Sequence, residues 1–144
     1  MPSWLLARAP FLLLAGWTIA LGLLVHHGVI PLPLPVRDFS GDALWAMMIA
    51  WWVAVIAPTA RLGVRSLLAL ITCWAVEFSQ LYHSPTVDRW RETAVGHLVL
   101  GSAFDARDLA AYAGGVLGAM ILERVASRAG LLRWSLTSRA AAQP

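Results

Sequence analysis

The stretch APFLLLAGWTIALGLLV, residues 9–25, decides the fold class, because its seventeen residues carry no charge. A helix that crosses the hydrocarbon core of a membrane needs about 20 mainly apolar residues. We therefore predict a first span over residues 9–26, with Arg8 at its start. A cleaved signal peptide is the alternative, since Ala20-Leu21-Gly22 offers small residues for cleavage. The apolar stretch is longer than a usual signal core, however, and further spans follow it.

The composition of the whole chain also indicates a membrane protein. Hydrophobic residues make up 59% of the 144 residues and charged residues only 13%, whereas a soluble domain carries about 25% charged residues. Lipid or a large apolar partner must therefore cover the surface. The net charge of +3 comes without a basic stripe, which argues against nucleic acid as a partner. The single cysteine, Cys73, excludes an intrachain disulfide.

Three further apolar runs predict three more spans, over residues 43–60, 66–82 and 108–124. The predicted fold class is all-α, a four-helix transmembrane bundle that forms one domain over residues 1–130. The tail over residues 131–144 is rich in Ser and Ala and is predicted to be disordered.

Two connections between the spans have unusual sequences. Residues 26–42 hold Pro31, Pro33 and Pro35, and this alternation favours an extended loop along the membrane surface. Residues 93–104, TAVGHLVLGSAF, are too few to span and too apolar for a plain loop. We expect a short re-entrant or interfacial segment there, or else an extended cover packed over the bundle.

The last span has a short apolar core and three closely spaced glycines. Its fourteen apolar residues, 109–122, rise about 21 Å, so Arg124 and Arg128 are expected to extend toward the membrane surface. Small residues let helix backbones approach closely in membranes, and this span contains Gly114, Gly115 and Gly118. The last span is therefore predicted to be the central, tightly packed helix.

The distribution of arginine predicts the orientation. Cytoplasmic loops of membrane proteins carry an excess of basic residues. Seven arginines fall on the side of the two termini, namely Arg8, Arg61, Arg65, Arg124, Arg128, Arg133 and Arg139. Four fall on the other side among acidic residues, namely Arg37, Arg89, Arg91 and Arg107. Both termini are thus predicted to be cytoplasmic (N-in/C-in).

With this orientation, the polar residues of the spans gather at the outer face. The candidate ligand-binding residues are Asp42, Glu77, Gln80, Arg89, Arg91, Asp108 and Tyr112. Glu77 and Gln80 are three residues apart and share a helix face, as do Asp108 and Tyr112, four apart. A charged group within a span needs a partner. We expect Arg89 or Arg91 to pair with Glu77, because a turn at Pro85 can fold the outer loop back over the bundle.

Each of these residues also has a structural interpretation. A pair between Glu77 and an arginine could simply fix the outer loop to the third span. Asp42 and Asp108 directly precede apolar runs, where Asp is a preferred helix N-cap.

The sequence predicts no metal site and no cofactor. His26, His27, His83 and His97 lack the HxxxH and HExxH spacings of metal sites. No phosphate-binding glycine loop, GxSxG motif or dinucleotide fingerprint occurs. Cys73 is expected to be an inert packing thiol.

Four motifs occur in a familiar order, DALWA at 42–46, EFSQLY at 77–82, RET at 91–93 and GHLVLGSAFDARDLAAYAGG at 96–115. In these motifs the chain resembles a family of small bacterial inner-membrane proteins that is known only as a domain of unknown function and is related to the VanZ-like group. Tyr112 stands where VanZ-like chains usually have Asn, and Trp45 and Met48 occur where an early histidine is common. The resemblance implies a multi-pass protein of the bacterial cytoplasmic membrane with an envelope role. Some members of the family carry a ribosome-maturation name, which no RNA-binding patch supports here.

Four functions fit these features. The favoured one is binding of an anionic lipid or lipid-linked headgroup, with Arg89, Arg91 and Arg107 against phosphate. The main alternative is a non-catalytic accessory or structural subunit of a membrane complex, with another membrane protein or a second copy as partner. An enzyme with Glu77 or Asp108 as general base and a small transporter are less favoured.

Overall fold

The computed structural model describes residues 3–93, 95–96 and 103–130, and all regular structure in that part of the chain is helical. α1 covers Ser3–His26, α2 covers Leu34–Ile56, α3 covers Leu62–Ser79, α4 covers Pro85–Arg91 and α6 covers Ala106–Arg128. Most of the segment 93–104 lies outside the described residues, as does the whole tail 131–144. The expectations for both segments therefore stay predictions.

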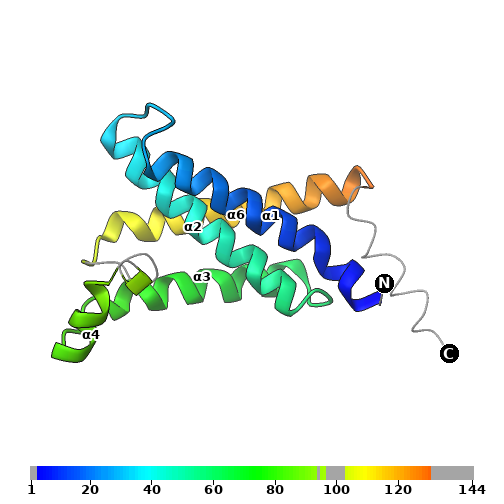
Figure 1. The fold of residues 1–144 in the computed structure, drawn as a ribbon. Helices are drawn as coiled ribbons and strands as arrows, with labels where there is room; N and C mark the ends of the chain where they lie inside the picture. Colours follow the sequence, from blue (N-terminus) through cyan, green and yellow to red (C-terminus); the bar gives the residue numbers. More distant parts are fainter. Residues whose placement is uncertain (1–2, 94, 97–102, 131–144) are drawn as a thin grey trace.

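Four of these helices, α1, α2, α3 and α6, are long and apolar enough to cross a membrane, which confirms the predicted all-α bundle of four spans. They alternate in direction (Figure 1), so Ser3 and Arg128 lie at the same end of the bundle. We call this end the arginine-rich end, after Arg8, Arg61, Arg65, Arg124 and Arg128. The opposite end, where α4 lies and α6 begins, is the acidic end, after Asp38, Asp42, Glu77, Asp105 and Asp108.

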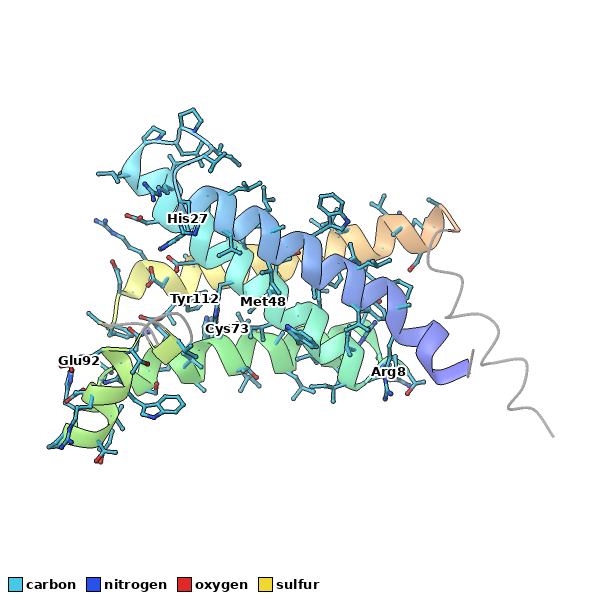
Figure 2. All side chains as sticks on the ribbon, in the orientation of Figure 1. Arg8, His27, Met48, Cys73, Glu92 and Tyr112 are labelled. Carbon is cyan, nitrogen blue, oxygen red and sulfur yellow. The ribbon has the colours of Figure 1, made fainter. Side chains whose placement is uncertain are left out.

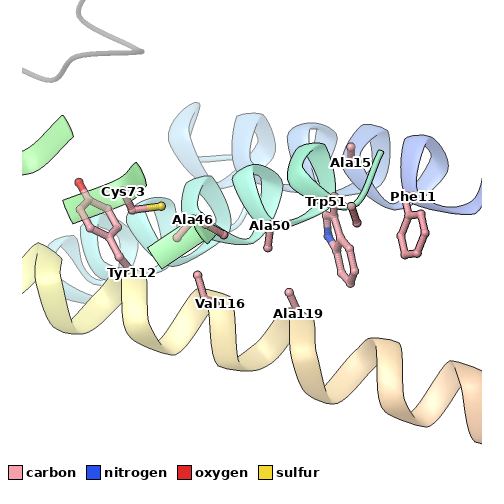
Figure 3. Packing of buried hydrophobic residues seen from close by; sticks show 11 residues of the cluster. Phe11, Ala15, Ala46, Ala50, Trp51, Cys73, Tyr112, Val116 and Ala119 are labelled. Atoms are coloured by element: carbon pink, nitrogen blue, oxygen red, sulfur yellow. The ribbon is translucent and has the colours of Figure 1, made fainter. Parts of the chain in front are cut away.

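The core is built around α2, which packs against α1, α3 and α6. Ala46, Ala50 and Ala54 are buried, and their spacing of four residues places them on one face of α2. Trp51 stacks on Phe11 of α1, with ring centroids 6.4 Å apart (Figure 3). The expectation that the last span is the central helix is therefore wrong, because α2 is the helix that packs against each of the other long helices.

The close approach expected at the glycines of the last span is confirmed at Gly115. A Cβ atom added there would lie 2.0 Å from the backbone oxygen of Ala43 on α2, so the two backbones are in direct contact. Gly114, by contrast, is exposed and has no atom within 4 Å of an added Cβ. The tight packing thus uses one face of α6, and Gly114 lies on another.

α2 begins nine residues earlier than expected, at Leu34 instead of residue 43. Pro33 is its N-cap residue and Pro35 lies in its first turn. Proline is tolerated there because the first N–H groups of a helix have no partner within it. Pro33 and Pro35 therefore start a helix rather than extend a loop, and the expected N-cap role of Asp42 is wrong because Asp42 lies inside α2.

α6 is also longer than its apolar core suggested. It runs for 23 residues, which corresponds to about 34 Å and is enough to span a hydrocarbon core. Polar residues at both of its ends continue the helix beyond the apolar part. The third span is likewise shifted, because α3 begins at Leu62 and ends at Ser79, whereas residues 66–82 were expected.

Candidate functional site

Glu77 lies at the centre of a hydrogen-bond network at the acidic end and is fully buried. Its Oε2 atom accepts hydrogen bonds from Nε2 of Gln80, at 3.1 Å, and from the hydroxyl of Tyr112, at 2.8 Å. Its Oε1 atom accepts from the backbone N–H of Asp105, at 2.8 Å. All three partners are donors, which suits a carboxylate because a carboxylate only accepts. Glu77 therefore joins the end of α3 to the start of α6.

Local contacts hold these partners in place. The Asp105 carboxylate accepts a hydrogen bond from the backbone N–H of Arg107, at 2.8 Å, and so caps α6. The cap expected at Asp108 is thus supplied by Asp105, and Asp108 lies in the first turn of the helix. The Tyr112 ring packs against Trp45 of α2, with centroids 5.4 Å apart. Figures 2 and 3 show Tyr112 near Cys73 of α3.

Asp42 of α2 and Asp108 of α6 form an acidic pair beside this network. Their carboxyl groups lie within hydrogen-bonding reach of each other. Both side chains are partly exposed. Among the described residues, no arginine or histidine forms a salt bridge with either of them. The pair is therefore an accessible group of hydrogen-bond acceptors without a cationic partner in this part of the chain.

The two arginines expected to pair with Glu77 make other contacts. Arg91 is buried and donates hydrogen bonds to the backbone oxygens of Ser79, at 2.8 Å, and Tyr82, at 2.9 Å. It also forms an ion pair with Asp88, at 3.1 Å. Arg91 thus fixes α4 to the last residue of α3 and to the turn that follows it; a cation is favourable at this end of a helix. Arg89 is exposed on α4 and donates to the backbone oxygen of Pro85.

Two buried polar atoms at the acidic end have no hydrogen-bond partner within the described part of the chain. They are Oε1 of Gln80, whose Nε2 atom donates to Glu77, and Nε of Arg91. Buried polar groups in proteins are almost always paired. The side chain of Gln80 is only 4% exposed, so its free oxygen is an acceptor inside the site, next to the acidic residues.

The arrangement can hold a positively charged or hydrogen-bond-donating group. Asp42 and Asp108 are joined there by the exposed side chains of Asp38 and Asp105, and Gln80 adds an acceptor. No group of three His, Cys, Asp or Glu side chains in the described residues has the geometry of a metal site. The exposed His83 side chain contacts Asp88, at 3.3 Å, and not the acidic pair.

The structure also contains a buried ion pair that the sequence interpretation missed. At the arginine-rich end, Arg65 of α3 and Glu123 of α6 form a salt bridge, and Arg65 is only 5% exposed. The Arg65 guanidinium lies over the Phe11 ring, at 5.2 Å from its centroid. Arg65 had been interpreted only as a flanking positive charge. Its position four residues before Ala69, on the buried face of α3, is the signal that could have found it.

Four apolar helices, a buried glutamate network and an acidic pair at one end define a small multi-pass α-helical membrane protein. The chain belongs to a family described as proteins of unknown function, DUF2809, which matches residues 32–116. The match covers α2, α3, α4 and the first half of α6, and it includes all seven candidate site residues. No solved structure matches the chain.

Proposed function

We propose that the acidic end binds the polar headgroup of a lipid or lipid-linked envelope molecule that carries both an amine and a phosphate. The amine lies against Asp42 and Asp108, and the phosphate lies against Arg107. The observation that carries this proposal is the acidic pair itself, two partly exposed carboxyl groups within reach of each other and without a salt bridge in the described residues. Carboxylates at a membrane surface attract ammonium groups by charge and by hydrogen bonding.

The charges of the site favour an amine-bearing headgroup over a purely anionic one. Arg91 was expected to bind phosphate, but two of its nitrogens already donate to carbonyl groups of residues 79 and 82. An anionic headgroup would also meet the carboxylates of the acidic pair. Arg107 is exposed in the first turn of α6, and the N-terminus of a helix is a favourable place for a phosphate.

The test is a lipid-binding measurement on the protein in nanodiscs made from native membranes. Lipids that co-purify are identified by mass spectrometry for the wild type, for the double variant Asp42→Asn/Asp108→Asn, and for Arg89→Ala as a control. We expect the wild type and the control to enrich an amine-bearing phospholipid or lipid-linked molecule, and the double variant to lose this enrichment. The Asn side chains keep the shape of the site but remove its charge.

Enrichment that is equal in the double variant and the wild type would refute the proposal. No enrichment in any sample would also refute it and would favour the accessory-subunit function. Co-purification of a stoichiometric membrane protein, in place of a lipid, would point the same way. In that case the acidic pair would serve the interface with the partner.

The relation to the VanZ-like group, the location in the bacterial cytoplasmic membrane and the N-in/C-in orientation are parts of the same proposal. The motif order of Asp42, Glu77, Gln80 and Asp108 supports the VanZ-like relation, and the meeting of these residues at one end of the bundle is consistent with a shared site. The excess of arginine at the opposite end supports cytoplasmic termini. The acidic end would then face the outer leaflet.

A further inference from the structure

A second candidate site lies at the other end of the molecule, between α3 and α6. An open apolar groove of about 270 Å³ runs between these two helices. Its walls include Gly63, Leu67 and Leu70 on α3 and Ala113, Leu117 and Met120 on α6. Leu67 and Leu117 are both more than half exposed, so the groove opens sideways, toward the surroundings of the bundle.

The groove is short compared with the two helices that line it. It begins at Gly63, the second residue of α3, and extends to Leu70, near the middle of that helix. The lining residues of each helix cover a stretch of eight residues, which rises about 10 Å and is less than half of the hydrocarbon core. A groove of this length fits part of a single lipid chain, whereas a helix from a second copy would require a surface along the full height of the span.

The end of the groove lies beside exposed positive charge. Arg124 follows Met120 by four residues on α6 and therefore lies on the same helix face, one turn nearer the arginine-rich end. Arg61 directly precedes α3 and is also exposed. Neither arginine side chain makes a hydrogen bond or ion pair within the described part of the chain. Glu123, the acidic residue of this end, is already paired with Arg65.

We infer that this groove binds an acyl chain of an anionic glycerophospholipid, with the phosphate of its headgroup against Arg124 and Arg61. The apolar walls take the chain, and the exposed guanidinium groups take the charge. Arginine binds phosphate through a planar pair of N–H donors. This site lies at the opposite end of the bundle from the acidic pair, so it does not depend on the function proposed there.

The test is native mass spectrometry of the full-length protein titrated with phosphatidylglycerol or with phosphatidylcholine of the same chains. We expect the wild type to bind phosphatidylglycerol more tightly. Arg124→Gln should reduce that preference about fivefold, which corresponds to about 1 kcal/mol for one basic residue near a lipid phosphate. Arg89→Gln, an exposed charge change at the other end, should leave it unchanged.

A second variant tests the chain-binding part of the groove. Gly63 has no atom within 4 Å of an added Cβ, so Gly63→Leu can fill the groove without disturbing the fold and should weaken binding of both lipids. Gly114→Leu, an equally open position outside the groove, is the matched control and should bind like the wild type. Equal binding of the two lipids by the wild type, or an unchanged preference in Arg124→Gln, would overturn the inference. A shift in the monomer–dimer ratio in Gly63→Leu alone would assign the groove to a second copy instead.

Discussion

Replacing Glu77 offers the sharpest test of how the acidic end is held together. The residue is fully buried and accepts three hydrogen bonds, from Gln80, Tyr112 and the backbone of Asp105. Glu77→Ala would leave all three donors without a partner. Double-mutant cycles in a membrane protein give about 0.6 kcal/mol for an average hydrogen bond between helices, and a donor left unpaired in a protein interior costs about 1–3 kcal/mol. We therefore expect Glu77→Ala to lower the free energy of unfolding by about 3–5 kcal/mol.

Glu77→Gln should be much milder, because two of the three partners can exchange roles. The Tyr112 hydroxyl can accept as well as donate, and the Gln80 amide can turn so that its oxygen accepts. The new amide group can then donate to both while its oxygen keeps the bond from Asp105. The loss is limited to the extra strength of hydrogen bonds to a charged acceptor, which is about 1 kcal/mol.

The free energy of unfolding can be measured by titrating the protein in mixed micelles with a denaturing detergent and following its helical content by circular dichroism. Tyr112→Phe should lower it by about 1 kcal/mol, as the loss of one hydrogen bond to a carboxylate. Tyr82→Phe, at a tyrosine that is 65% exposed, is the matched control and should have no effect. A Glu77→Ala variant within about 1 kcal/mol of the wild type would refute the structural role of Glu77.

Three further predictions concern the rest of the bundle. Gly115→Ala should lower the melting temperature because its methyl group would meet the backbone of α2, whereas Gly114→Ala should not. Equal melting temperatures of the two variants would contradict the close contact between α6 and α2. Glu123→Leu should lower the free energy of unfolding by about 3 kcal/mol or more because it strands a buried guanidinium. Adding Arg65→Met to this variant should recover most of that loss. If the two substitutions change the free energy of unfolding additively in the same detergent titration, Arg65 and Glu123 do not stabilise the fold as a pair. Cys73 is fully buried and should react with a maleimide only on unfolding, so rapid labelling of the folded protein, detected by mass, would be inconsistent with the core.

The number and nature of the long helices could be predicted because apolar length determines them, whereas the short α4 was not predicted. Any uncharged run as long as residues 9–25 needs an environment without water. The ends of the helices were harder to predict, since they depend on polar residues that can extend a helix into the membrane surface. The prolines before α2 are the clearest case. The same residues favour an extended loop or the first turn of a helix, and the choice depends on the tertiary packing of α2 against α1 and α6.

The importance of Glu77 could be predicted, but its partners could not. A charged residue inside a span needs compensation, and the nearest arginines in sequence were the natural candidates. The structure uses neutral donors instead, one of which is the backbone N–H of Asp105, 28 residues further along the chain. A backbone donor carries no signal in the sequence. Arg91 binds other groups, the carbonyl oxygens of Ser79 at the end of α3 and of Tyr82 in the turn that follows. Carbonyl groups of this kind follow every helix, and no sequence motif marks them.

Within the acidic end, Glu77 has a structural role, whereas the acidic pair is the candidate binding site. Glu77 has a full set of partners, so its burial is explained without any ligand. Asp42 and Asp108 are different, because they keep two acidic groups close together at a partly exposed position. Two full negative charges at that position would weaken the folded protein unless something positive is bound there. A ligand that neutralises the pair should therefore raise the stability of the wild type and leave Asp42→Asn/Asp108→Asn unchanged. The charge-neutral variant should itself be more stable than the wild type in the absence of ligand, and a loss of stability in that variant would mean that the two carboxyl groups serve the fold and not a binding site.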